Sequence, residues 1–177
     1  ALEVQDQQAV KRLQITNTGG TLIAGQKLAV DAAHDSGDGS LLSQGELTLQ
    51  FDGDYLLTGT VQANGAADVH VTGHLTNQGK LLSADQLKVQ AESLDNTAQG
   101  EISAARTTVD VSGLLANRGL IDGQETRISA ATLQNLGTGR LYGDHLALQA
   151  QVLENGIESG VESGAGSDVA AVIAARH

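Results

Sequence analysis

Residues 75–96 read LTNQGKLLSADQLKVQAESLDN, and this stretch decides the fold. It begins and ends with a Leu-x-Asn motif, and between the two motifs Leu87 and Val89 alternate with polar residues. Alternation with a period of two is typical of a half-buried β-strand, whereas an amphipathic helix needs apolar residues at i, i+3, i+4 and i+7. We therefore expect Leu87 and Val89 to point into a core, with Gln86 and Lys88 facing water.

The same unit returns along the chain about every 20 residues, which is the signature of a repeat protein. Seven glycines mark it at spacings of 19 to 21 residues: Gly19, Gly39, Gly59, Gly79, Gly100, Gly119 and Gly139. An apolar marker follows each glycine: Ile23, Leu42, Val61, Leu82, Ile102, Ile121 and Leu141. Val69 follows its marker by 8 residues where the other units have 7, which predicts an extra residue in the loop 62–65. One buried column is expected from Val30, Leu49, Val69, Val89, Val109, Ile128 and Leu148.

A single unit of this length cannot bury its apolar side alone, but stacked units can. The sequence therefore predicts an all-β fold, a parallel β-helix (solenoid) of about eight coils, right-handed because crossovers between parallel strands almost always are. The coils are expected over residues 13–156. Residues 1–12 are expected to form a partial or irregular N-terminal coil, and residues 157–177 an irregular C-terminal segment that leads into a further coil.

The composition agrees with a thin, repeated core. The chain has 177 residues with 22 Gly, one Phe, two Tyr and no Cys, Pro, Met or Trp, so Leu, Val, Ile and Ala must fill the interior. The formal net charge of -11 argues against a nucleic-acid partner, which requires clustered Lys and Arg. No apolar run is long enough to cross a bilayer, so membrane insertion is not expected.

An asparagine recurs with the repeat, in the Leu-x-Asn motif or its relative Ile15-Thr16-Asn17. Asparagine suits a corner of the backbone, and amides stacked in register can hydrogen-bond along the axis of the stack. A residue that recurs in every coil is typical of structure, whereas a binding site is usually a unique cluster. We expect a structural ladder of Asn17, Asn77, Asn96, Asn117, Asn135 and Asn155. It should be broken in the second and third repeats, which lack the asparagine.

The pattern resembles the haemagglutinin repeat of the filamentous haemagglutinin family. The best matches are residues 94–104, from Leu94-Asp95-Asn96 to Ala104, and residues 139–150, and the resemblance covers roughly residues 13–155 together with the segment 170–176. Members of that family are large exoproteins of Gram-negative bacteria exported by two-partner secretion, among them adhesins and the stalks of contact-dependent growth inhibition toxins. The resemblance implies a β-helical filament outside the cell and an outer-membrane transporter as secretion partner.

Three features of the sequence could indicate a functional site, and each has a structural explanation. His70 and His74 lie four residues apart and would share a face on one strand, but two ligands do not close a metal site. Residues 35–39 (DSGDG) suggest a calcium loop but lack the spacing and the closing Glu of an EF-hand. Parallel β-helices also occur in polysaccharide-cleaving enzymes, yet no outer face concentrates carboxylates here. We therefore expect no catalytic residue, no metal and no cofactor.

The sequence thus predicts a shaft segment of a secreted, cell-surface filamentous protein, a monomeric rod that extends a distal adhesion or toxin-delivery region and is not an enzyme. The alternative is a binding module in which the β-helix itself contacts a cell-surface receptor or glycan. Tyr55 and Tyr142 are the only tyrosines that could supply an aromatic platform for a sugar.

Overall fold

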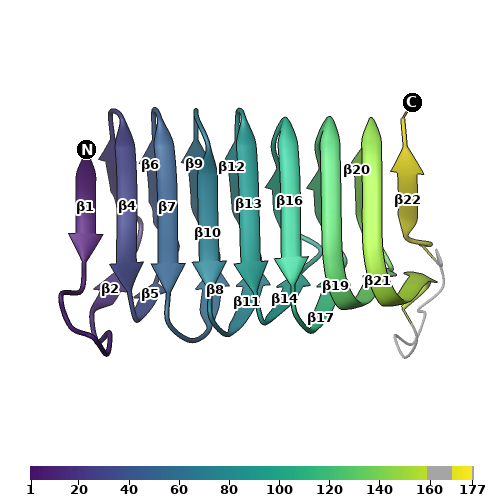
Figure 1. Ribbon diagram of the computed structural model, residues 1–177, viewed down its shortest axis with the longest axis horizontal. Helices are drawn as coiled ribbons and strands as arrows, with labels where there is room; N and C mark the ends of the chain where they lie inside the picture. Colours follow the sequence, from purple (N-terminus) through teal and green to yellow (C-terminus); the bar gives the residue numbers. More distant parts are fainter. Residues whose placement is uncertain (159–168, 177) are drawn as a thin grey trace.

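The computed structural model describes residues 1–158 and 169–176, and all of its regular structure is β. The strands stack side by side along one axis, from the N-terminal β1 to the C-terminal β22 (Figure 1). Every strand pair in the described part of the chain is parallel, and partners come from neighbouring turns of the chain. The protein is therefore a parallel β-solenoid of about seven turns, one fewer than the sequence suggested.

Three faces make up each turn, which we call face 1, face 2 and face 3. Face 1 holds β1 (Leu2–Gln5), β4 (Lys27–Ala32), β7 (Glu46–Phe51), β10 (Ala67–Val71), β13 (Gln86–Ala91), β16 (Arg106–Val111) and the first halves of β19 (Glu125–Leu136) and β21 (His145–Gly156). Face 2 holds β2 (Gln14–Thr16), β5 (His34–Ser36), β8 (Tyr55–Leu57), β11 (His74–Asn77), β14 (Ser93–Asn96), β17 (Leu114–Asn117) and the second halves of β19 and β21. Face 3 holds β3 (Thr21–Ala24), β6 (Ser40–Ser43), β9 (Thr60–Ala63), β12 (Lys80–Ser83), β15 (Glu101–Ser103), β18 (Leu120–Asp122), β20 (Arg140–Gly143) and β22 (Val172–Ala175).

The predicted column of apolar residues on face 1 is present with the predicted register. Val30 pairs with Leu49, Val89 with Val109, and the series ends where Ile128 pairs with Leu148. All members are buried except Leu148, which is only partly covered because β21 pairs with β19 alone among the described strands. Burying one such side chain completely contributes about 1.5–3 kcal/mol, so the column is a main source of stability.

The predicted apolar markers of face 3 are wrong by one residue in three of the coils. The column that stacks is Leu22, Leu41, Val61, Leu81, Ile102, Ile121, Leu141 and Ile173. Ile23, which the spacing favoured, is 58 % exposed, because successive side chains of a strand point to opposite faces. Where two apolar residues are adjacent, as in Leu41-Leu42, spacing alone cannot choose between them.

The corner between face 3 and face 1 also differs from expectation. The loop 62–65 holds no extra residue, since Ala63 pairs with Ser43 and Ser83, and Ala67 pairs with Leu47 and Leu87. The later coils are instead one residue shorter at this corner, and they place Thr107 and Thr126 where most earlier coils have leucine and one has Ala67. Their buried hydroxyls donate to the carbonyls of Asp122 and Tyr142, each at 2.7 Å. A buried carbonyl needs such a donor, so the threonines compensate for the tighter turn.

Both ends of the described chain contribute a strand to the solenoid. β1 lies within residues 1–12 and pairs with β4, and β22 pairs with β20 after the segment 159–168. Arg176 fixes the end of β22, because its guanidinium donates to Asp122, Asp144 and the carbonyl of Gly123. The predicted irregular segment 157–177 lies in large part outside the described residues. No helix that could span a membrane is found in the described part of the chain.

Candidate functional site

A row of buried asparagines runs along the corner where face 2 ends. The side chains of Asn77, Asn96, Asn117 and Asn135 are fully buried, and the backbone ladder sets each beside the next. The Nδ2 group of each donates to Oδ1 of the following asparagine at 2.7–2.8 Å, and the row ends on Asn155. All four bonds point toward the C-terminus, so the row is one polarised chain of amides, which we call the asparagine ladder.

The Nδ2 groups of Asn77, Asn96, Asn117 and Asn135 each make a second bond, to a backbone carbonyl at the start of face 3 one coil further on. Asn96 donates to the carbonyl of Leu120, and Asn117 to that of Arg140. The chain turns this corner so closely that a Cβ on Gly100 would clash with Oδ1 of Asn96. The recurring glycine therefore makes room for the asparagine, and the two residues form one corner unit.

Asn17 has the same local arrangement but is not joined to the ladder. Its Nδ2 donates to the carbonyl of Ser40 at 3.3 Å, in the way that its equivalents do. The two coils that lie between Asn17 and Asn77 place Gly37 and Leu57 in the column. Neither side chain can continue the amide chain, so the structure separates Asn17 from the other five.

The early coils hold a different buried polar pair, which the sequence did not reveal. Asp35 and Tyr55 both point inward from face 2, and the Tyr55 hydroxyl donates to Oδ2 of Asp35 at 3.4 Å. Oδ1 of Asp35 has no partner among the described residues. Burial raises the pKa of the Asp35 carboxyl, and burial beside Asp35 also raises the pKa of the Tyr55 phenol, which stays a donor. The signal was an acid at a position where the other coils carry Leu, Ile or, in the next coil, Tyr55.

The burial of Tyr55 changes two of the interpretations of the sequence. Its side chain is only 3 % exposed and packs on Phe51 with ring centroids 4.4 Å apart, so it is not available as a platform for a sugar. Asp35 faces the core, so it is not placed as a ligand in an open calcium loop.

His70 and His74 lie on different strands, β10 and β11, and His74 instead contacts Ser93 Oγ at 2.6 Å through Nδ1. No cluster of three metal-ligating side chains occurs in the described residues.

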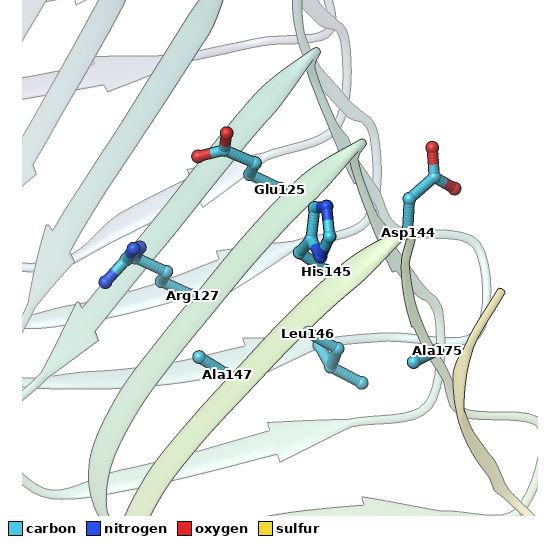
Figure 2. A pocket seen from close by; sticks show the side chains of 7 residues that line it. All are labelled: Glu125, Arg127, Asp144, His145, Leu146, Ala147 and Ala175. Atoms are coloured by element: carbon cyan, nitrogen blue, oxygen red, sulfur yellow. The ribbon is translucent and has the colours of Figure 1, made fainter. Parts of the chain in front are cut away.

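The outer side of face 1 carries charged and polar side chains, among them Glu125 and Arg127. Its C-terminal part carries a shallow hollow of about 500 Å³ lined by Glu125, Arg127, Asp144 and His145 (Figure 2). Glu125 and Arg127 extend from β19, and His145 extends from the neighbouring β21, while Asp144 is held by Arg176. A cationic guanidinium and an imidazole beside carboxylates could bind a small polar ligand, but the hollow is open to solvent.

The fold and the asparagine ladder place the chain among parallel β-solenoids with buried amide ladders. No protein-family profile matches the chain, and no solved structure matches it. Three curated relatives are CdiA proteins: "Toxin CdiA" of Escherichia coli, 32 % identical over 80 residues; "Deoxyribonuclease CdiA" of Dickeya dadantii (strain 3937), 36 % over 99 residues; and "16S rRNA endonuclease CdiA" of Enterobacter cloacae subsp. cloacae, 34 % over 121 residues. These matches cover 45 %, 56 % and 67 % of this chain. The chain spans only 3–4 % of the length of these relatives.

These comparisons correct two expectations. The sequence was expected to come from a protein that is not an enzyme and has no nucleic-acid partner. Relatives are named as a deoxyribonuclease, a tRNA nuclease and a 16S rRNA endonuclease, so both expectations are wrong for the proteins to which the chain is similar. The expectation of no nucleic-acid partner came from the net charge of this segment alone. The nuclease names describe relatives many times longer, so the charge of the segment does not bear on what those proteins act on.

Proposed function

We propose that this chain is a β-helical shaft segment of a secreted nuclease toxin of the contact-dependent growth inhibition type. The main support for this proposal is the uninterrupted register of the coils. Each coil of about 20 residues lengthens the rod by one strand spacing of about 4.8 Å. The partial similarity to toxin proteins supports the toxin assignment. The nuclease action and the nucleic-acid substrate belong to this proposal for the whole protein.

Three finer features go with the proposal. The coils wind to the right, as parallel crossovers do in almost all proteins. The asparagine ladder is structural, since its amides are satisfied by one another and by the backbone. The protein acts outside the cell, at the surface of a Gram-negative bacterium, and the occurrence of the relatives in Escherichia, Dickeya and Enterobacter supports this location.

Deletion of one coil tests the shaft proposal. Leu94 pairs with Leu115, so removal of residues 94–114 brings two equivalent positions together and keeps the register. Coils contact mainly their neighbours, so the shortened protein should fold, be exported and retain toxin activity. Removal of residues 94–103 is the control, because it deletes the face 2 and face 3 strands of one coil and joins the end of β13 directly to the start of β16, both on face 1, and it should abolish export. Loss of activity after the in-phase deletion, in a protein that is folded and exported, would contradict a spacing role.

The alternative function, contact with a receptor or glycan, is favoured by the hollow on face 1 (Figure 2). Glu125 and Arg127 present charged groups there that make no ion pair in the described part of the chain. An Arg127→Ala variant that lowers cell binding, with the circular dichroism spectrum unchanged, would move recognition into the shaft. Unchanged cell binding would leave the spacing role.

A further inference from the structure

Face 2 is interrupted inside the stack, between β5 and β8. β5 pairs with β2 and β8 pairs with β11, but no strand pairing joins β5 to β8. Face 1 and face 3 continue across the same level, because β4 pairs with β7 and β6 pairs with β9 (Figure 1). We call the interruption in face 2 the seam. The coils on its two sides keep their register, but backbone ladders join them on two faces only.

The backbone on each side of the seam is bonded to the coil that lies away from it. The amide of Asn17 donates to the carbonyl of Ser36 at 2.8 Å, which ties β5 to the preceding coil. The amide of His74 donates to Oδ1 of Asp54 at 2.8 Å, which ties the corner before β8 to the following coil. Gly53 in that corner has a φ of 105°, and a Cβ added there would meet no atom within 4 Å. The corner therefore has room to move.

Two side-chain hydrogen bonds cross the seam. The Tyr55 hydroxyl reaches Oδ2 of Asp35 at 3.4 Å, which is long for a bond between two oxygens, and Oδ1 of Asp35 has no partner. The Thr58 hydroxyl donates to the carbonyl of Gly37 at 3.1 Å. The asparagine ladder does not cross, because Gly37 and Leu57 occupy its column at this level. A place with so few hydrogen bonds opens at a lower free-energy cost than the ladders around it.

The two edges of the seam differ in how firmly they are held. Over face 2 the seam is covered by a hollow of about 430 Å³, lined among others by His34 and by Leu56, which is 46 % exposed. At the face 1 edge Lys11 contacts Asp31 on one side of the seam and lies 3.9 Å from Asp52 on the other. Motion is therefore free toward face 2 and restrained toward face 1.

We propose that the seam is a hinge of the shaft, at which residues 1–45 and residues 46–158 tilt apart on face 2 while the ladders of face 1 and face 3 stay paired. Hinges absorb a rotation in a few backbone positions. Gly37 and Gly53 supply such positions at the seam, since both have a φ of 105° and glycine adopts such angles readily. A bend at one defined coil would change the direction of the rod, which goes beyond the spacing role and does not depend on it.

Distances between pairs of spin labels test the hinge, and the chain has no native Cys that would interfere with labelling. Cysteines at Ser36 and Asp95 place labels on face 2 three coils apart, with the seam between them. Thr76 and Gln134 are also three coils apart on face 2, but without a seam. The third pair, at positions 29 and 88, spans the same level as the first on face 1. Each pair is about 14 Å apart along the backbone, which is three strand spacings.

Electron paramagnetic resonance of the frozen protein gives the distance distribution for each pair. The pair across the seam on face 2 should have a distribution at least about twice as broad as either control pair, extended toward longer distances. Tyr55→Phe removes one of the two bonds across the seam and should broaden it further. Tyr142→Phe, on face 3, is the matched control and should leave it unchanged. Circular dichroism establishes that each variant retains its β structure.

Three outcomes would overturn the hinge. The first is a distribution across the seam that is as narrow as those of the two control pairs. The second is equal broadening of all three pairs, which would indicate motion of the whole stack. The third is an equal effect of Tyr55→Phe and Tyr142→Phe on the pair across the seam.

Discussion

Replacement of Asn117 by alanine is the sharpest test of the asparagine ladder. Asn117 lies in the middle of the ladder, accepts from Asn96 at 2.7 Å and donates to Asn135 at 2.8 Å. The substitution removes both bonds and leaves Oδ1 of Asn135 buried without a donor. Nδ2 of Asn96 keeps its bonds to the carbonyls of Gly100 and Leu120, so its loss is smaller. A lost hydrogen bond costs about 1 kcal/mol and an orphaned buried polar atom about 1–3 kcal/mol, which predicts a total of ~2–4 kcal/mol.

Thermal unfolding followed by circular dichroism measures this loss. For a chain of this size each kcal/mol lowers the melting temperature by about 2–4 °C, so Asn117→Ala should lower it by about 5–15 °C. Asn64→Ala is the matched control, because Asn64 lies at an exposed corner and its side chain makes no hydrogen bond in the described part of the chain. The control should change stability by less than about 0.5 kcal/mol. Equal melting temperatures for the two variants would refute the claim that the ladder stabilises the stack.

Two further substitutions test the interior. Val89→Asp should lower the free energy of unfolding by several kcal/mol in urea titration, because Val89 is fully buried between Val69 and Val109 and a carboxylate there has no partner; wild-type stability would refute the register. Burial raises the folded-state pKa of Asp35 above that of the unfolded chain, so ionised Asp35 costs stability, and this cost appears as the pH rises from about 4 through the raised pKa. Asp35→Asn should therefore raise the melting temperature at pH 7 but not at pH 4, and a difference that is the same at both pH values would contradict the burial of an acid there.

The fold could be predicted from the sequence because its two signals are strong and independent. Strand alternation and the recurrence of glycine and asparagine share one period, and stacking in register then fixes which residues meet, as the column through Val89 confirms. The errors arose where a local pattern was ambiguous. Adjacent leucines such as Leu81 and Leu82 do not show which of the two points inward. The shorter corner before Thr107 can be recognised only by comparison with the corresponding corners of the neighbouring coils.

The buried pair Asp35–Tyr55 was missed for a different physical reason. An acid followed by Ser and Gly is typical of a turn at the surface, and a tyrosine is often exposed at a polar segment. Their burial depends on two residues 20 positions apart being stacked face to face, each supplying part of what the other needs. The residues that flank Asp35 or Tyr55 in the sequence do not reveal this contact. Alignment of the coils by their period does, because it places the two residues in one inward-facing column.

The asparagine ladder gives the stack of coils a direction. At its N-terminal end the ladder is closed, because Leu57 cannot donate to Asn77 and the backbone amide of Gly79 bonds to the Asn77 side chain instead. At its C-terminal end Asn155 exposes a donor, so the ladder can grow only in that direction. A further coil in register would place an acceptor beside Nδ2 of Asn155 and would cover the edge of β21, in the way that each coil covers the one before it.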